Sequence, residues 1–275
     1  VDWYSELLRP AITHNHTLDI SGASEKTNYS FGANYYYQEG IMKATNDYER
    51  FNFRARLDQK VNSWLNLGVN AVVSDYTKNN ANNEAFFKAY VSPPTYPVYD
   101  NTNTDAYPVQ FGSPQDYGYG AVYANPVAIA YYNNDREHGL KTIFSTFAEI
   151  SIIPEKLKFK TSYNLDYNSW KSRNYSPEYL VGGSQGQNQS SLSKTLGNSY
   201  RQIIDNLLIY SDAVGDHSFN VMLGQSTRIE RKYTETGSSL NVPYVDEQSL
   251  YLNLGSSSTL FVNDGNGVYG YNGIS

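Results

Sequence analysis

The chain has 275 residues, of which 15% are aromatic, with 27 tyrosines, no cysteine and a net charge of −6. The lack of cysteine excludes disulfides and thiolate metal sites. Positive and negative residues are scattered along the chain, which argues against a nucleic-acid binder, because such a protein needs a basic patch. A mean hydropathy of −0.57 together with many aromatic residues is typical of a transmembrane β-barrel with a polar lumen and aromatic girdles. A Tyr-rich extracellular β-protein has the same composition.

Eight segments of the sequence are predicted to be β-strands, because apolar and polar residues alternate along them. Several exceed ten residues, which is long for a globular protein but suits a tilted strand that crosses a bilayer and needs about 9–11 residues. The alternation is clear in the third segment, where Phe51 and Phe53 oppose Asn52 and Arg54, and it is broken in the seventh. The eight segments are 14–24, 27–39, 48–61, 64–76, 139–152, 156–170, 199–213 and 217–231.

The connections between these segments are short and long in turn. The short links are centred on residues 25–26, 62–63, 154–155 and 215–216, and the long ones cover 40–47, 77–138 and 171–198. A barrel sorts its connections in this way, with short periplasmic turns and longer extracellular loops. The sequence therefore predicts an all-β, antiparallel up-and-down transmembrane β-barrel segment, with residues 1–275 in a single barrel domain. Residues 77–138, 171–198 and 232–275 are predicted to be extracellular loops.

Two features predict that the eight strands are part of a larger barrel. The loop over 77–138 is large for a small barrel, and the chain ends in Gly- and Asn-rich sequence rather than in a closing strand. An unpaired edge in lipid would leave backbone groups unsatisfied. A self-contained eight-stranded barrel that acts as an adhesin or anchor is the alternative. Neither a signal peptide nor an apolar run long enough for a transmembrane helix is visible.

Residues 21–29, with the sequence SGASEKTNY, resemble a hairpin motif of the SusC/RagA family of TonB-dependent outer-membrane transporters. Residues 2–3, 38–41, 50–58 and 125–130 match the family in the same order. Ala23 stands where the family usually has glycine, a small departure because alanine also suits the end of a strand. The resemblance is densest over residues 1–75 and extends to about residue 255.

This resemblance implies a barrel of about 22 strands in the outer membrane of a Gram-negative bacterium, with a plug domain. It also implies a SusD-like surface lipoprotein as partner, TonB as the source of energy coupling, and often a dimer of transporter–lipoprotein pairs. The plug, the TonB-contacting segment and the remaining strands are absent from this chain. The expected function is active import of oligosaccharides, and peptide import is the alternative.

Aromatic residues of the long loop 77–138 are the predicted substrate-binding residues. Tyrosine offers a flat ring and a hydroxyl, which suit a sugar, although the same rings could instead pack the loop against its neighbours. A helical turn is predicted at 82–90. The nine candidates are Phe86, Phe87, Tyr90, Tyr96, Tyr99, Tyr107, Tyr117, Tyr119 and Tyr123.

Polar residues of the second and third strands are predicted to face the lumen and the plug, because each set lies at alternate positions. Among them, Arg54, Arg56 and Asp58 are expected to form a charged ladder between barrel wall and plug. The full set is Asn34, Tyr36, Gln38, Arg54, Arg56 and Asp58.

No cofactor, metal site or enzymatic activity is predicted. His14 and His16 share one strand face without a third ligand nearby, whereas metal sites usually need three or four. Asn101, Asn103 and Asp105 resemble part of a calcium loop but lack its glycine and its distal glutamate, which favours a plain turn. No catalytic motif is present, and nothing in the sequence supports the paired carboxylates of a glycosidase.

Overall fold

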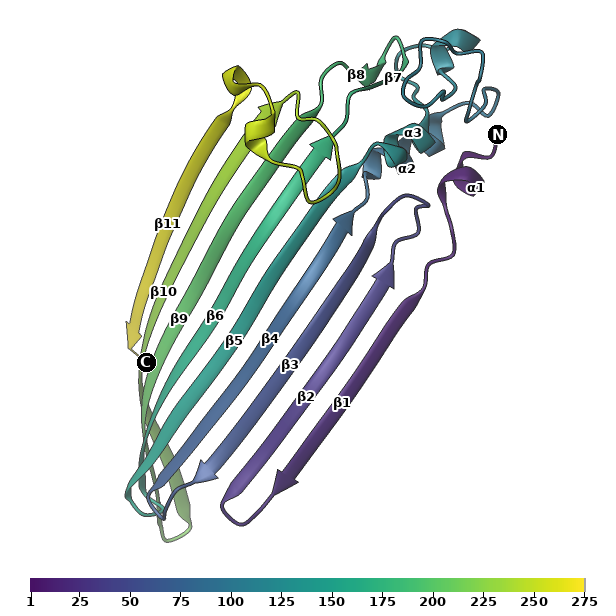
Figure 1. The fold of residues 1–275 in the computed structure, drawn as a ribbon. Coiled ribbons are helices and arrows are strands. Elements are labelled where there is room, and N and C mark those ends of the chain that lie inside the picture. The colour runs from purple at the N-terminus through teal and green to yellow at the C-terminus, as the bar shows by residue number, and fades with distance from the viewer. Residues whose placement is uncertain (275) are drawn as a thin grey trace.

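The computed structural model describes residues 1–274, and its main feature is one antiparallel sheet of nine strands in the order β1-β2-β3-β4-β5-β6-β9-β10-β11 (Figure 1). The eight predicted segments each coincide with one of these strands. Because β5, β6, β9 and β10 have 20–24 residues, they are longer than a bilayer requires. The strands are β1 (Thr13–Ala23), β2 (Thr27–Glu39), β3 (Asp47–Lys60), β4 (Leu65–Asn80), β5 (Asn134–Ile153), β6 (Leu157–Ser176), β9 (Ser191–Val214), β10 (His217–Leu240) and β11 (Phe261–Ile274).

The prediction that residues 232–275 are a loop is wrong in two stretches. Strand β10 continues to Leu240, and β11 is a ninth strand that pairs with β10 from Phe261 to Ile274. The Gly- and Asn-rich sequence of β11 has little intrinsic strand preference. Pairing along the neighbouring strand overrides that preference, because β-propensity depends strongly on context.

The other long loops are also shorter than predicted. Strand β4 extends to Asn80 and β5 begins at Asn134, which reduces the loop of 77–138 to residues 81–133. Similarly, β6 reaches Ser176 and β9 begins at Ser191. A hairpin of β7 (Tyr179–Gly182) and β8 (Gln185–Gln187) lies between them, where the sequence indicated only a loop.

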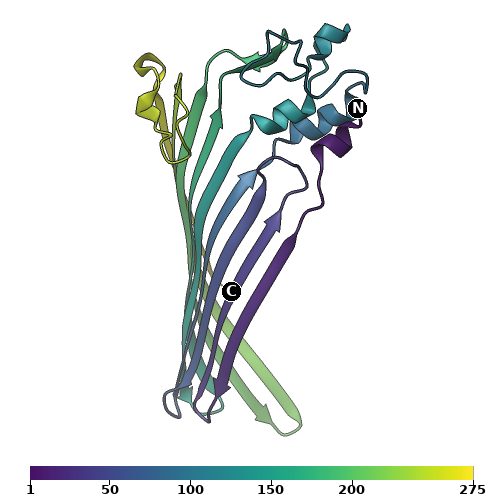
Figure 2. The same cartoon turned by 45° about the vertical axis from the view of Figure 1, so that its right-hand side comes forward.

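The sorting of connections by end of the sheet is confirmed. The turns at 24–26, 61–64, 154–156 and 215–216 lie at one end, and the helices and long loops lie at the other (Figure 1). The sheet is curved (Figure 2) and is open in this structure, with β1 and β11 at its edges over the described residues. A closed eight-stranded barrel is therefore not what residues 1–274 form.

The two faces of the sheet differ in chemistry. Residues that pair across strands share a face, so the register defines an apolar face that includes Phe31, Ala55, Ala71 and Phe144. The opposite, polar face includes Arg54 and the residues in register with it. Many side chains of the apolar face are large and at least one third exposed. They include Leu18, Ile20, Phe51, Phe53, Leu57, Val69, Ile204, Val221 and Leu223.

Three glycines on the polar face lie under aromatic rings of the adjacent strand. A Cβ atom added to Gly197 would lie 2.2 Å from the Trp170 ring, and one added to Gly139 would lie 2.5 Å from the Tyr76 ring. Gly68 is covered by Phe147 in the same way. Because each ring occupies the space above a glycine in the register, these pairs fix strand alignment through contact that only glycine permits.

The hydrophobic core lies in the loops, not in the sheet. It packs three short helices, α1 (Trp3–Leu7), α2 (Asn83–Val91) and α3 (Pro126–Tyr131), around the buried rings of Tyr96 and Phe111. The 3₁₀ turn η1 (Pro114–Tyr117) belongs to the same loop, and η2 (Leu252–Leu254) and η3 (Ser257–Thr259) lie between β10 and β11. The helix predicted at 82–90 is confirmed as α2. Within residues 1–274, no helix has the length and apolar character needed to span a membrane.

Candidate functional site

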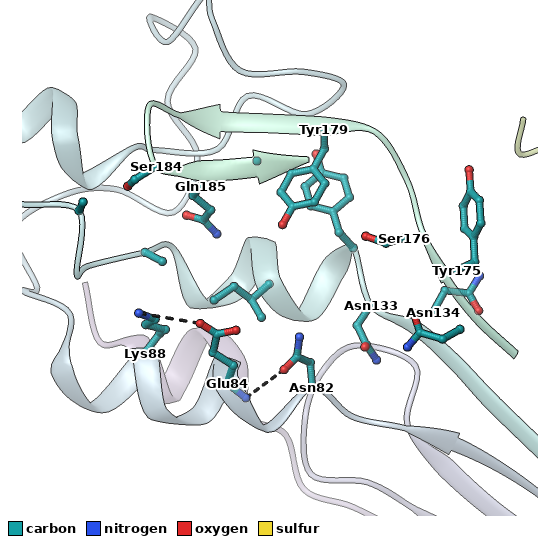
Figure 3. A pocket seen from close by; sticks show the side chains of 16 residues that line it. Asn82, Glu84, Lys88, Asn133, Asn134, Tyr175, Ser176, Tyr179, Ser184 and Gln185 are labelled. Carbon is teal, nitrogen blue, oxygen red and sulfur yellow. Dashed lines mark hydrogen bonds and ion pairs between the residues drawn. The ribbon is translucent and has the colours of Figure 1, made fainter. Parts of the chain in front are cut away.

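A polar hollow of about 310 Å³ lies between α2, α3 and the β7–β8 hairpin, at the long-loop end of the sheet. Figure 3 shows Tyr179, Ser184 and Gln185 of the hairpin region on one side and Asn82, Glu84 and Lys88 of the α2 region on the other. The upper ends of β5 and β6 complete the lining. Their contributions are Asn134, Asn174, Tyr175 and Ser176, together with Asn133.

Asn125 and Gln185 hold this region together through a buried set of hydrogen bonds. The Asn125 side chain caps α3 by accepting from the backbone N–H groups of Val127 (3.1 Å) and Ala128 (3.2 Å). Its amide donates to the carbonyls of Val98 (2.9 Å) and Gly112 (3.0 Å). Asn125 therefore joins three segments of the loop, which fixes one wall of the hollow.

The Gln185 side chain clamps the backbone of Asn125 from the hairpin. Its Oε1 accepts from the Asn125 N–H at 2.7 Å, and its Nε2 donates to the Asn125 carbonyl at 2.9 Å. Both residues are buried, with Asn125 0% exposed. Because a buried amide with all its groups paired is rigid, the hairpin and α3 are held in one arrangement.

The hollow is polar and close to neutral. Glu84 and Lys88 lie 3.9 Å apart, and Lys88 also donates to the Val122 carbonyl at 2.8 Å. Tyr179 stacks on Tyr132 with ring centroids 4.0 Å apart. Burial, and then the carboxylate of Glu84, raises the pKa of Tyr179, so its phenol stays protonated at neutral pH and can donate a hydrogen bond.

Four polar groups of the lining form no side-chain hydrogen bond with the rest of residues 1–274. They are the hydroxyls of Tyr132, Tyr179 and Ser184 and the amide of Asn174, whereas Asn133 donates to the Asn80 carbonyl at 2.6 Å. Free amide and hydroxyl groups around a neutral hollow suit a ligand with many hydroxyls or amides.

None of the nine predicted aromatic residues lines this hollow. Tyr96 is 0% exposed and donates to the Ala124 carbonyl at 3.1 Å. Burial raises the pKa of Tyr96 to about 12. Its prediction as a substrate contact is corrected, because a fully buried ring has no free face. Tyr119 and Tyr123 are half-buried and pack edge to face with centroids 5.8 Å apart.

The other six aromatic candidates are exposed in this structure and remain predictions. Three of them have partners in the same loop or in the neighbouring β6–β9 connection. The hydroxyl of Tyr117 donates to Asp100 at 2.9 Å, that of Tyr107 donates to Glu178 at 3.1 Å, and Tyr99 stacks on Phe111. The last three form an exposed aromatic patch on α2, made of Phe86, Phe87 and Tyr90.

The six predicted lumen residues all lie on the polar face. The register pairs Asn34 of β2 with Asn52 of β3, and Arg54 with Gly32 of β2. Arg54 forms an ion pair with Asp19 of β1. Their neighbours on the same face are Tyr36, Gln38, Arg56 and Asp58, with Arg56 and Asp58 paired at 2.7 Å.

The polar face carries a second, charged hollow of about 320 Å³ nearer the middle of the sheet. It is lined by Lys141 and Asp166, which are 3.9 Å apart, and by Arg201 and Glu230, which are 3.2 Å apart, with Tyr76 beside them. The first ion pair joins β5 to β6, and the second joins β9 to β10. The polar face therefore carries several charged pairs, whose burial in lipid would cost too much free energy.

The two motifs considered for metal binding have other roles in this structure. His14 and His16 stack on Tyr37 and Tyr35 of β2, with ring centroids 6.3 and 6.4 Å apart. Asn103 is buried and donates to the carbonyls of Phe111 and Val181. Within the described residues, no group of three or more His, Cys, Asp or Glu side chains could hold a metal ion.

Sequence reasoning missed the amide residues of the polar hollow. Asn82, Asn133 and Asn174 lie far apart in the chain, and Gln185 belongs to a Gly/Ser/Gln-rich segment that was interpreted as loop. The available signal was the pair of Asn-rich stretches at 79–83 and 133–134, which span the end of β4 and the start of β5. Because paired strands end at the same edge of a sheet, these stretches had to meet.

The chain is similar in sequence to two TonB-dependent receptors of Formosa agariphila. It is 26% identical to TonB-dependent receptor P26 over 228 residues, which is 81% of this chain and 22% of the receptor. It is 22% identical to TonB-dependent receptor P3 over 235 residues, with 82% of this chain and 22% of that receptor covered. The chain therefore spans about a fifth of the length of these relatives. No family model matches it.

The fold is similar to that of solved structures of the RagAB peptide transporter. One has a TM-score of 0.73 at 16% identity and covers 98% of this chain and 30% of that one. The RagAB peptide importer in the open-open state gives a TM-score of 0.74 at the same identity, with 99% and 30% covered. The resemblance to SusC/RagA-type TonB-dependent transporters that residues 21–29 suggest is confirmed.

Proposed function

We propose that this chain forms part of the barrel wall of a TonB-dependent transporter that imports oligosaccharides across the bacterial outer membrane. The polar hollow carries the proposal. Its free amide and hydroxyl groups, and its single internally paired Glu84–Lys88 couple, match a neutral ligand rich in hydroxyls. The apolar face would contact lipid and the polar face the lumen and plug, as in barrels generally.

In this arrangement the long loops are extracellular and the short turns are periplasmic. A SusD-like lipoprotein would cover the loop end, and TonB would act through parts of the transporter outside residues 1–275. Two such transporter–lipoprotein pairs could form a dimer. Catalysis has no place in the proposal, since reversible recognition of the substrate is all that import requires of this segment.

Peptide import is the second candidate, because the similar solved structures are of a peptide transporter. A peptide could form hydrogen bonds with the amide groups of the hollow, but it also carries charged termini. Among the residues that line the hollow, Glu84 and Lys88 are the only charged ones, and they neutralise each other. This balance favours a neutral oligosaccharide.

The test measures binding of an oligosaccharide panel and a peptide panel to the full-length transporter–lipoprotein complex, with the double variant Tyr179→Phe/Asn174→Ala. Neither side chain has a hydrogen bond within residues 1–274 to lose, so folding should be unaffected. Each lost ligand hydrogen bond is worth about 1 kcal/mol, so affinity for oligosaccharide should fall by roughly tenfold to thirtyfold.

The matched control is Tyr251→Phe, which removes an exposed hydroxyl from the loop between β10 and β11, outside the hollow and outside the nine aromatic candidates. Unchanged affinity in the double variant, or an equal loss in the control, would contradict a ligand site in the hollow. Binding confined to the peptide panel would replace the oligosaccharide with a peptide. If neither panel binds and cells that lack the protein take up both ligands normally, an adhesin or anchor would be the better description.

A further inference from the structure

A cluster of basic side chains lies on the apolar face of the sheet, above its apolar band and below the loop between β10 and β11. Arg136 and His138 come from β5, Lys171 and Arg173 from β6, and Lys194 from β9. They line a hollow of about 420 Å³ whose floor is mainly apolar and includes Leu196, Leu252 and Val262. We call this the basic hollow.

The strand register places these side chains together. Arg136 pairs with Arg173, and His138 pairs with Lys171. Arg173 in turn pairs with Lys194 across β6 and β9. Because paired residues share a face, all five project from the apolar face, the side that would contact lipid in the proposed transporter.

The basic hollow contains more positive than negative charge. Its lining has four lysine or arginine cations and one carboxylate, Glu235, which leaves a charge of +3 at neutral pH in a chain whose net charge is −6. Glu247 reduces this to +2 through its ion pair with Arg173, and Asp75 lies 3.6 Å from His138. No ion pair forms to Arg136, Lys171 or Lys194 within residues 1–274.

Their height above the apolar band matches a lipid head group. Arg136 is four residues beyond Leu140, and Lys171 is four residues beyond Tyr167, the last apolar or aromatic residues of the band on β5 and β6. At about 3.3 Å per residue, Arg136 and Lys171 lie roughly 13 Å along the strand from the band edge. Because a membrane strand is tilted by about 45°, this is roughly 9 Å along the bilayer normal, beyond the acyl chains and at the outer side of the head-group layer.

We propose that the basic hollow binds the phosphate groups of an anionic lipid in the outer leaflet. The cations would hold the phosphates, while the apolar floor and the band beneath would contact the acyl chains. A lipid is favoured over a protein partner because the site opens on the lipid-contacting side, has an apolar floor and stands above the apolar band on the same strands. This inference rests on the proposed membrane setting but not on the transported substrate.

The test uses native mass spectrometry of the full-length transporter in mild detergent, titrated with diphosphorylated lipid A or with its dephosphorylated form. The variant is Arg136→Gln/Lys171→Gln/Lys194→Gln. Each cation near an anionic surface contributes roughly fivefold to affinity, so the variant should bind diphosphorylated lipid A about a hundredfold more weakly. The dephosphorylated lipid should bind weakly to both proteins, and excess inorganic phosphate should not displace the lipid.

The matched control is Lys158→Gln/Lys160→Gln/Lys232→Gln, which removes the same charge from the polar face. It should bind the lipid as the native protein does. The proposal is overturned if the basic-hollow variant keeps its affinity, or if phosphate on the lipid makes no difference. A variant that loses the lipoprotein partner but keeps the lipid would instead assign the hollow to protein contact. Substrate affinity measured on the same variant separates failure here from failure of the transport proposal.

Discussion

Replacing Asn125 with alanine should loosen the loop that builds the polar hollow, with little effect on the sheet. The change removes the cap of α3, worth about 1 kcal/mol. It also leaves the buried carbonyls of Val98 and Gly112 without their donor, at a cost of about 1.5 kcal/mol each. The local free energy of opening should therefore fall by about 4 kcal/mol.

Hydrogen exchange of the full-length protein measures this directly, because it reports opening of individual segments. A loss of about 4 kcal/mol corresponds to exchange roughly a thousandfold faster in α3. The matched control is Asn82→Ala, since Asn82 caps α2 through one exposed hydrogen bond to the Glu84 N–H and should cost about 1 kcal/mol. If Asn125→Ala speeds exchange no more than the control does, the buried amide does not hold the loop together.

Three further changes test the sheet and the loop. Gly197→Ala should destabilise the sheet by about 1–3 kcal/mol, measured by thermal unfolding, because the added Cβ overpacks against Trp170. The same change in a Trp170→Ala background should be nearly neutral. Phe53→Arg should lower the free energy of unfolding in a bilayer by about 2–4 kcal/mol if its face contacts lipid, whereas Asn52→Arg should be tolerated. If a refolding assay shows Asn52→Arg to be the more destabilising change, the polar face would be the one that contacts lipid. Asp100 accepts hydrogen bonds that lower its pKa from 3.8, so it stabilises the loop above about pH 4 and loses this effect as the pH falls through the lowered value; Asp100→Asn should remove this acid sensitivity of limited proteolysis.

Strand positions could be predicted because their signal is local. The alternation around Phe51 and Phe53 marks one face of β3 without reference to any partner, and the short turns mark where strands must reverse. Strand ends were less predictable. The upper part of β10 and all of β11 lack apolar alternation, so only the pairing from Gln225 to Ser238 shows that they are strands.

The seventh predicted segment shows what alternation alone leaves undecided, namely which face each side chain occupies. Ile203 and Ile204, and likewise Leu207 and Leu208, place apolar side chains on both faces of β9. The strand is regular nevertheless, because its neighbours fix the register on both sides. The prediction of a strand is confirmed, but alternation left its faces ambiguous because it tests one strand at a time, whereas pairing is decided by three strands together.

The site could not be predicted for the same reason. The aromatic residues of the long loop were chosen for their chemistry, but Tyr96 is buried with Trp3 at a centroid distance of 4.7 Å. A short loop in water would expose such rings, whereas this loop is long enough to form a core of its own. The residues left to line the hollow are the amides at the strand ends, whose proximity follows from the register of β4 and β5.

The charges along the long-loop end of the apolar face predict on which side of the sheet the lipid binds. In the row that contains Arg136, Arg173 and Lys194, the residues on β2 and β3 are Glu39 and Asp47. If these charged residues served only solubility, positive and negative side chains would not need to lie on separate strands. An anionic lipid would be drawn to the side of β5, β6 and β9 and repelled from that of β2 and β3, so one bound lipid per chain is expected at saturation. Two equivalent lipids, one on each side, would show that charge does not select the site.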